Sequence, residues 1–429
     1  MKTKIISFRG LSFFVMVLLF TFSTFPLWAQ NTGAELKFKS IYGEVYNKQD
    51  NHPVVFASVF LKGTNIGTVT NLEGKFLIKV PASSINDTLG ISSLGYKTLY
   101  VKLDQLTSKL NRLKLEPAIV PLDEVVVRHM DPRALINAAL WNISKNYSDV
   151  PVMMSAFYRE SIKKNRNYVS VGEAVLNVYK SSYSHFIDND RVSIYKGRKS
   201  QAVRHMDTLL VKFLGGPLVV SFLDLVKNPG DILSREMLDC YNFHVAGVLM
   251  MDGHETYEIQ FDQADTVSYP LYKGSIFLDA KTLAFTAIKF EISPKQMQRA
   301  TAYLVRKKPA GLKAELIGTH YFVKYRKIGD KWFLNYVRME NEFRFKWEKR
   351  LFHSNYTFLS EAAITSISHK NVEKQRLKFS LKSTEAFSDK VSDFQDPEFW
   401  GASNIIEPES SIQSAIKKIS RKLDRWNNN

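Results

Sequence analysis

Hydrophobic and polar positions alternate in short runs between residues 40 and 127, a pattern typical of an all-β module. One run places three apolar residues on one side of a predicted strand, alternating with their neighbours: Phe76, Ile78 and Val80 against Lys75, Leu77 and Lys79. Gly74 is expected to supply the positive φ angle of the turn before this strand. Residues 54–60 and 89–100 show similar strand-like apolar runs, and a second turn is expected at Gly95.

A different periodicity begins near residue 131. Asp131 is a suitable N-cap with Pro132 at the first helical position, and apolar residues at helical spacing predict a helix over 132–146. Residues 207–233 are predicted to be mostly helical, with a break at Gly215-Gly216-Pro217 before 218–226. An antiparallel meander is then expected, with strands over 243–251, 254–262, 271–279, 282–292, 316–327 and 331–347.

The last of these strands shows the clearest alternation, with period two along its length. One side is charged and is expected to face water: Arg338, Glu340, Glu342, Arg344 and Lys346. The other side is apolar: Val337, Met339, Phe343, Phe345 and Trp347. A long aromatic strand of this kind could also belong to a small outer-membrane barrel, although the helical stretches and irregular strand lengths argue against that.

Five motifs in the first module resemble the carboxypeptidase regulatory-like domain. They are Gly43-x-Val45, Pro53-x-x-x-Ala57-x-Val59, Thr70-Asn71-x-x-Gly74-x-Phe76, Ser92-x-x-Gly95-Tyr96 and Leu122-Asp-Glu-Val-Val-Val127. The resemblance implies a seven-stranded transthyretin-like β-sandwich over residues 40–127 without catalytic residues of its own. The family often has Asp where this chain has Asn71, which leaves no acidic or calcium-binding role implied for that turn.

In its commonest setting, this family domain precedes the plug and large barrel of TonB-dependent outer-membrane receptors, and it also occurs beside zinc carboxypeptidases. Here it is followed by a predicted helix and about 300 residues of mixed structure, which do not match a receptor. Residues 131–395 are therefore interpreted as an α+β antiparallel-sheet domain. The hairpin around Asp279 is faintly similar to lipoprotein-carrier folds, which are open half-barrels.

That faint similarity leaves two interpretations of the apolar side of the meander. It could accept a lipid or acyl chain, or it could be the packed core beneath helices 132–146 and 217–227. Residues 396–429 are predicted to end in a basic amphipathic helix that begins near Pro408. Its apolar stripe, Ile412, Ala415, Ile416, Ile419 and Leu423, could dock on its own domain or lie on an anionic membrane.

The first 29 residues are typical of a signal peptide, with three basic residues, an apolar run over 11–25 and Ala29 before the expected cleavage point. Their removal would lower the formal net charge from +17 to +14. For an exported protein, this excess favours anionic lipids or acidic glycans as partners over nucleic acid. Cys240 is the single cysteine, so an internal disulfide is excluded.

A search for chemistry yields no catalytic, cofactor-binding or metal-ligating constellation. None of the nine histidines begins a zinc-peptidase motif. The pairs His254–Glu255 and His369–Glu373 are expected to lie on the surface and not to bind metal. Cys240 reads as a small buried residue, and His244 is not placed to activate it along an extended strand.

The sequence therefore predicts a mainly β protein with α elements, exported to the periplasm or the outer membrane, that binds rather than catalyses. The sandwich would be an interaction module, and the larger α+β domain would bind a ligand or an envelope partner. A half-barrel that carries lipid or lipoprotein is the alternative, and a small membrane barrel is a further one.

Overall fold

The computed structural model describes residues 38–84, 86–118, 130–184, 189–201, 216–305, 309–393 and 399–427. The predicted signal peptide at 1–29, the predicted strand at 122–127 and the first part of the helical prediction at 207–233 lie outside these residues.

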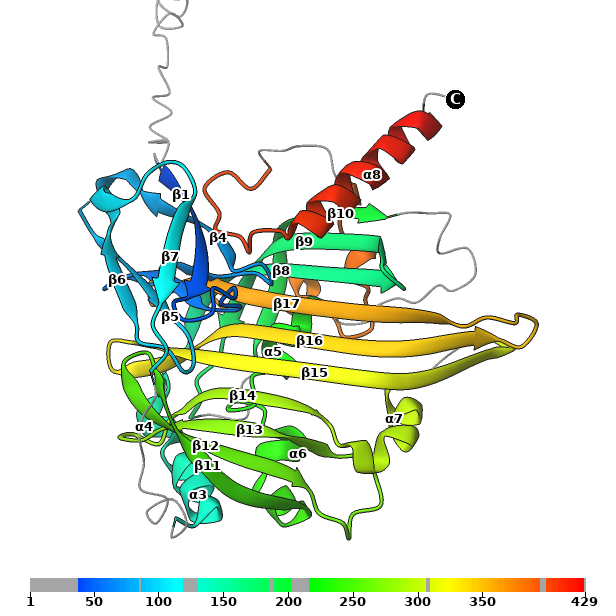
Figure 1. Cartoon of the computed structure of the whole chain (residues 1–429), viewed down its shortest axis with the longest axis horizontal. Coiled ribbons are helices and arrows are strands. Elements are labelled where there is room, and N and C mark those ends of the chain that lie inside the picture. The colour runs from blue at the N-terminus through cyan, green and yellow to red at the C-terminus, as the bar shows by residue number, and fades with distance from the viewer. Residues whose placement is uncertain are drawn as a thin grey trace, which may run out of the picture. The chain divides into compact units, whose positions relative to one another are not determined.

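The N-terminal module is a sandwich of two sheets with seven strands in all, as predicted (Figure 1). One sheet has the order β4-β1-β7, with β1 at Phe38–Asn47, β4 at Lys75–Pro81 and β7 at Asn111–Leu115. The other has the order β3-β2-β5-β6, with β3 at Gly67–Val69, β2 at Ser58–Leu61, β5 at Thr88–Ser92 and β6 at Leu99–Lys102. Phe76, Ile78 and Val80 are buried between them, and Gly74 and Gly95 have the positive φ angles expected of their turns.

The rest of the chain builds one eleven-stranded sheet in the order β11-β12-β13-β14-β15-β16-β17-β8-β9-β10-β18. Its early strands are β8 at Val152–Lys164, β9 at Asn167–Lys180 and β10 at Arg191–Gln201. The meander comprises β11 at Tyr241–Met251, β12 at His254–Gln263, β13 at Tyr272–Asp279, β14 at Phe285–Ile292, β15 at Leu312–Ile328, β16 at Lys331–Trp347 and β17 at Ser354–Ser368. The short β18 spans Ser392–Asp393. The predicted meander strands are confirmed within a few residues, and the sheet stays open, with β11 and β18 at its edges among the described residues.

Helices cover one face of this sheet. They are α3 at Pro132–Trp141, α4 at Ile143–Asn146, α5 at Val219–Phe222 and α6 at Gly230–Leu233. Asp131 caps α3 by accepting the Arg133 N–H at 2.9 Å, as predicted. Side chains of α3, α4 and α5 pack with the apolar row of the sheet in one large core that includes Ile136, Val220, Ile259 and Val337. Of the two interpretations of the apolar face, a packed core is therefore the one observed.

The prediction of a helix over 217–227 is wrong beyond Phe222, where α5 ends. The chain turns there, and the Asp224 side chain lies in the core as a hydrogen-bond acceptor. Its carboxylate accepts from the hydroxyls of Tyr183 at 2.6 Å and Tyr325 at 2.8 Å, and Lys180 lies 2.5 Å away. This arrangement requires an irregular turn after α5. The structure also contains α7 at Met297–Leu304, which was not predicted although Ser293 and Pro294 supply a cap and a first-turn proline just ahead of it.

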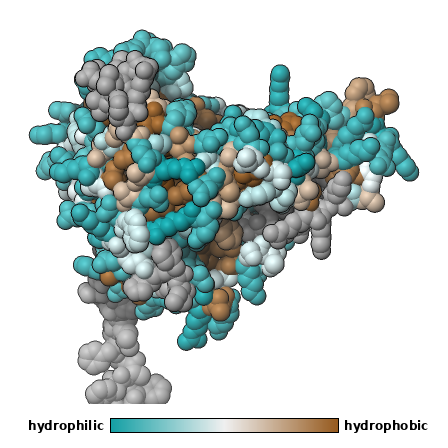
Figure 2. Space-filling view, turned by 90° about the horizontal axis from the view of Figure 1, so that it is seen from below, coloured by the Kyte–Doolittle hydropathy of each residue, from teal (hydrophilic) through white to brown (hydrophobic). Residues whose placement is uncertain are grey.

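Around α3 and β11, the molecular surface mixes hydrophobic with hydrophilic side chains (Figure 2). At the other end of the chain, residues 399–409 lead into α8 at Ser410–Asn427. Ile412 is fully buried, so the first turn of this helix docks on the protein's own domain. The later stripe residues Ile419 and Leu423 lie outside the side chains that the structure describes.

Candidate functional site

A single row of side chains crosses the sheet face opposite the helices. Adjacent members are register partners on neighbouring strands from β11 to β10, so all of them point to the same side. In spatial order the row is His244, Gln260, Ser275, Lys289, Phe322, Arg338, Glu361, Arg159, Glu173 and Arg198. Its second half alternates in charge. In its first half Lys289 forms no ion pair among the described residues, although the nearby Glu258 carboxylate partly offsets the desolvation that lowers its pKa.

The alternating half is buried, with Arg159 at its centre and fully inaccessible to solvent. Arg159 donates through Nε and Nη2 to Glu173 at 2.9 and 2.8 Å, and through Nη1 to Glu361 at 3.3 Å. Arg338 donates to the second oxygen of Glu361 at 3.3 Å and is 8% exposed. The prediction that the charged side of 331–347 faces water is therefore wrong at Arg338, because the sandwich covers it: the guanidinium lies 5.1 Å from the ring centroid of Phe56.

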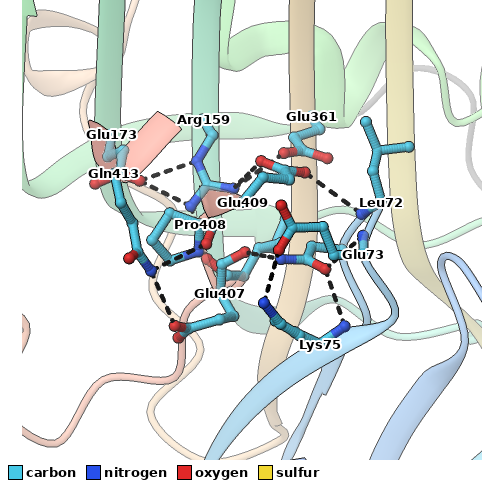
Figure 3. Close-up of polar contacts among 12 residues, drawn as sticks. Leu72, Glu73, Lys75, Arg159, Glu173, Glu361, Glu407, Pro408, Glu409 and Gln413 are labelled. Carbon is cyan, nitrogen blue, oxygen red and sulfur yellow. Dashed lines mark hydrogen bonds and ion pairs between the residues drawn. The ribbon is translucent and has the colours of Figure 1, made fainter. Parts of the chain in front are cut away.

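The C-terminal segment closes over Arg159 (Figure 3). Arg159 Nη2 donates to the Ile406 carbonyl at 2.7 Å, and the Glu409 carboxylate lies 4.0 Å from Nη1. Glu409 also accepts the backbone N–H of Leu72 from the sandwich at 3.4 Å. In return, Glu73 accepts the backbone N–H and the hydroxyl of Ser410, both at 2.9 Å, and thereby holds the start of α8.

The turn at Asn71 belongs to the same junction. Its side-chain oxygen accepts the N–H groups of Glu73 and Lys75, both at 2.9 Å, and its amide donates to the Glu407 carbonyl at 2.9 Å. The residue that departs from the family pattern therefore shapes the turn and binds the C-terminal segment. The sandwich, this segment and strands β8, β9 and β17 meet at one polar joint.

Electrostatics keep Arg159 charged. Burial opposes its charge, but the carboxylates of Glu173, Glu361 and Glu409 outweigh burial and raise the pKa of Arg159. Burial also raises the pKa of Glu409, an effect that the charge of Arg159 counteracts. Removal of the arginine would therefore leave several buried carboxylates without compensation.

The other half of the row forms the floor of a groove of about 800 Å³ between the sandwich and the sheet. Gln260, Ser275, Lys289 and Phe322 lie along this floor. The sandwich supplies an apolar wall that includes Val54, Val55, Phe56, Leu94 and Tyr96. The Gly95 N–H donates to the Met250 carbonyl at 2.8 Å, which joins the sandwich turn to the β11–β12 hairpin beside the groove.

Phe56 is held in the wall by an unusual backbone conformation. Its φ angle is +55°, in a region that bulky side chains rarely adopt. The ring stacks on Tyr336 at a centroid distance of 5.3 Å and lies against Arg338. These contacts position one aromatic ring over both the charged half of the row and the groove.

Two cations that line the groove, Lys289 and Lys324, have no carboxylate within ion-pair distance among the described residues, and the same is true of Arg326, which lies near Lys324 outside the groove lining. Lys289 keeps its ammonium open to the groove, 5.6 Å from the Phe322 ring centroid, while the surrounding walls desolvate it and lower its pKa. The two acidic residues that line the groove already form ion pairs with other lysines. Glu291 pairs with Lys273 at 3.0 Å, and Asp262 lies 3.3 Å from Lys295.

Lys324 and Arg326 lie deeper. Lys324 is 2% exposed and donates to the Ser92 carbonyl at 3.3 Å, and burial lowers its pKa to about 8. Burial likewise lowers the pKa of Arg326 to about 10; its guanidinium lies 4.9 Å from the Phe60 ring centroid and its Nε has no hydrogen-bond partner. Asp252 favours the charge of both but does not form an ion pair with either. This part of the groove is therefore an electropositive site lined by apolar rings.

The residues considered for chemistry in the sequence do not assemble. Cys240 is partly exposed rather than buried, and its sulfur lies 3.8 Å from the Tyr269 hydroxyl. His244 lines the groove, whereas His254 faces Asp279 at 3.9 Å and His369 packs on Phe333. Within the described ranges, three or more His, Cys, Asp or Glu side chains are nowhere grouped so as to hold a metal ion. The groove has no local signal in the sequence, because strand pairing assembles its floor and the packing of the sandwich on the sheet supplies its wall.

Comparison with known proteins identifies the first module. A family model for the CarboxypepD_reg-like domain matches residues 41–127. This region is a CarboxypepD_reg-like domain. The match confirms the resemblance carried by the five sequence motifs and covers the sandwich that forms one wall of the groove, but it does not extend to the eleven-stranded sheet.

Two curated proteins are similar over short regions. The TonB-dependent receptor P39 of Formosa agariphila is 34% identical over 130 residues, which are 30% of this chain and 11% of the receptor. The replicase large subunit of Soil-borne wheat mosaic virus is 27% identical over 132 residues, which are 31% of this chain and 7% of the replicase. The chain thus spans about a tenth of the length of these relatives, or less.

Solved structures offer distant similarities. A DUF1329 family protein from Desulfovibrio piger aligns with a TM-score of 0.25 and 11% identity over 57% of this chain and 96% of that protein. A LolA superfamily protein from Nitrosomonas europaea aligns with a TM-score of 0.19 and 9% identity over 57% and 98%, respectively. Among the described residues, none of the helices is long and apolar enough to cross a membrane.

The buried row predicts a large loss of stability when its central cation is removed. Replacing Arg159 with Met should lower the free energy of unfolding by about 3 to 5 kcal/mol, because buried carboxylates lose their partner. The matched control is Arg344→Met, which breaks an exposed 3.0 Å pair with Glu315 and should cost about 1 kcal/mol or less. Urea unfolding measures both, and equal effects would contradict the assigned role of Arg159.

Lys324 predicts a specific pH dependence. Below about pH 8 it is charged in both the folded and unfolded states, so folding bears the cost of desolvating the ammonium. As the pH rises from about 8 towards the usual lysine value of 10.5, the unfolded state retains a proton that the folded state has lost, and stability increases. Lys324→Met should therefore be more stable than wild type at neutral pH, by about 1 to 3 kcal/mol.

This difference should shrink as the pH approaches 10.5, and urea unfolding across the range measures it. Arg326 remains beside Asp252 in the variant, so that carboxylate keeps a cation nearby. The exposed Lys313→Met serves as the control and should show a difference independent of pH. A Lys324→Met protein that is less stable than wild type at neutral pH would refute the assignment.

Proposed function

We propose that this protein is a non-catalytic binding protein of the bacterial envelope that holds an anionic amphiphile in the groove between its sandwich and its sheet. The ligand chemistry is a carboxylate or phosphate head joined to an acyl chain. The observation that carries the proposal is a groove of about 800 Å³ in which Lys289 and Lys324 lack carboxylate partners beside an apolar wall.

The head group fits the electropositive part of the groove. Lys289 is the accessible cation, and an anion beside it would restore the interaction energy that partial desolvation removes. Lys324 lies behind it and would gain from the same negative charge. Arg338 also borders the groove, but its charge is already compensated by Glu340 at 2.5 Å and Glu361 at 3.3 Å. Selectivity for an anion thus depends on the two lysines.

The acyl chain fits the walls. Val54, Val55 and Tyr96 of the sandwich supply apolar surface along the groove, and its volume lies within the usual range of small-molecule sites. Phe56 packs on Phe322 with ring centroids 6.2 Å apart, and Leu94 packs with Met251, so these contacts bound the space. Burial of such a chain contributes about 0.8 kcal/mol per methylene, so modest lengths suffice for binding. The alternative ligand site expected from the sequence, the apolar face of the meander, is filled by helices.

The envelope location is part of the proposal. It is supported by the signal-like first 29 residues and by the TonB-dependent receptor that shares similarity with about 130 residues of this chain. In this proposal the CarboxypepD_reg-like domain forms half of the ligand site rather than a separate spacer.

A fluorescent fatty acid and its methyl ester test this proposal directly. The acid should bind the wild-type protein, and Lys289→Met should weaken its affinity by about tenfold or more, because a hydrogen bond to a charged group contributes about 1.5 to 3 kcal/mol. The uncharged ester should bind more weakly and be indifferent to the substitution. Fluorescence titration gives each dissociation constant.

Lys273→Met is the matched control. Lys273 also lines the groove, but it is already paired with Glu291 at 3.0 Å, so its replacement should leave fatty-acid affinity nearly unchanged. Equal affinity for acid and ester, or equal losses in the two variants, would refute the anionic-head assignment. A wild-type protein that binds neither probe would refute the proposed function itself.

A further inference from the structure

The tip of the β16–β17 hairpin carries the two most exposed large hydrophobic side chains in the described part of the chain. Leu351 is 88% exposed and Phe352 is 85% exposed. They are adjacent in sequence and lie at the end of a hairpin that projects beyond β8 and β9 (Figure 1). At this end of the molecule, hydrophobic side chains protrude among hydrophilic ones (Figure 2). Apolar side chains in such a position are costly in water and point to a partner.

Basic residues surround this tip. Lys349 and Arg350 directly precede the apolar pair, and the neighbouring β8–β9 turn lies alongside, because the backbone amide of Asn355 donates to the Asn165 side chain at 3.0 Å. Cations at this end include Lys163, Lys164, Arg166, Lys313, Lys346, Lys349 and Arg350. Glu348 is the acidic residue within the tip, and the ion pair between Arg344 and Glu315 is neutral as a unit. The tip is thus strongly electropositive.

An aromatic base supports the tip. Phe343 and Phe345 stack with ring centroids 5.7 Å apart, and Phe345 meets Tyr356 edge-on at 5.3 Å. Lys164 lies over the Tyr356 ring at 5.8 Å. A hollow of about 450 Å³ lies behind Leu351 and Phe352, lined in part by Lys164, Trp347 and Arg350. The exposed pair is therefore presented from a packed base, with cations around a recess large enough for a polar head group.

We propose that this tip docks on an anionic lipid bilayer, with Leu351 and Phe352 inserted at the boundary between head groups and acyl chains. Charge complementarity selects this partner, since clustered Lys and Arg beside an anionic surface each add about 1 kcal/mol of attraction. Insertion of two apolar side chains supplies the second contribution that stable membrane attachment requires. A specific protein interface usually buries about 800 Å² on each partner, which a hairpin tip with two apolar residues does not offer.

Vesicle flotation tests the docking with the chain from Gln30 onward, which retains every described residue and lacks the apolar run at 11–25. Wild type should bind vesicles of phosphatidylethanolamine and phosphatidylglycerol, and should bind phosphatidylcholine vesicles far less. The double variants Leu351→Ser/Phe352→Ser and Lys349→Gln/Arg350→Gln should each bind the anionic vesicles at least about tenfold more weakly. High salt should reduce wild-type binding because it screens the charges.

Two controls match these changes elsewhere on the surface. Leu377→Ser/Phe379→Ser removes another exposed apolar pair, at 68% and 66% exposure, and Lys281→Gln/Lys370→Gln removes the same net charge. Both should bind anionic vesicles like wild type. Equal loss in test and control variants, or full binding by the tip variants, would overturn the proposal. Binding of wild type to envelope fractions but not to lipid vesicles would also overturn it and assign the tip to a protein partner.

Discussion

The burial of Arg159 among three carboxylates is the constraint on which the rest of the architecture depends. Its partners Glu173 and Glu361 come from the strands on either side, and Glu409 comes from the C-terminal segment. Such a network contributes less to stability than an apolar core of equal volume would, but breaking it is costly. We interpret its main effect as specificity, because a one-residue slip of β8 would turn Arg159 towards the helix-covered core. The register of the central strands and the closure of the C-terminal segment are thus coupled.

The groove is a consequence of where that charge pattern stops. From Arg338 to Arg198 every charge in the row has an opposite neighbour, so the C-terminal segment and the sandwich can cover it. Beyond Phe322 the row continues with Lys289, Ser275 and Gln260, and no carboxylate pairs with the lysine among the described residues. Close packing of the sandwich there would bury an uncompensated charge. The sandwich instead touches the sheet around Leu94 and Phe56 and leaves space between them.

Local pattern is enough to predict short strands over 40–127, the turns at Gly74 and Gly95, and the meander strands, because each depends on residues close in sequence. The seven-stranded sandwich follows from the family resemblance, since its sheets join strands far apart in sequence, such as β1 and β7. What covers each face of the large sheet is not predictable from local pattern. The alternation in 331–347 correctly separates a charged from an apolar side, yet it cannot reveal that Phe56 covers Arg338. Arg159 and Glu361 are 202 residues apart, so their pairing follows from the joining of β8 to β17 rather than from any local signal. The same is true of the lysines in the groove.

A binding site between two elements normally requires that both be ordered when the ligand arrives, which weakens affinity. Here the sandwich and the sheet are fixed to each other outside the groove, by the Glu73–Ser410 and Leu72–Glu409 contacts and by the hydrogen bond from Ser58 to Asn335 at 2.6 Å. The walls around Lys289 are therefore in place before a ligand binds. Any ligand in the groove contacts both walls and so stabilises their junction in turn. The buried charges around Arg159 thus act on binding without touching the ligand, because they hold the two halves of its site at a defined separation.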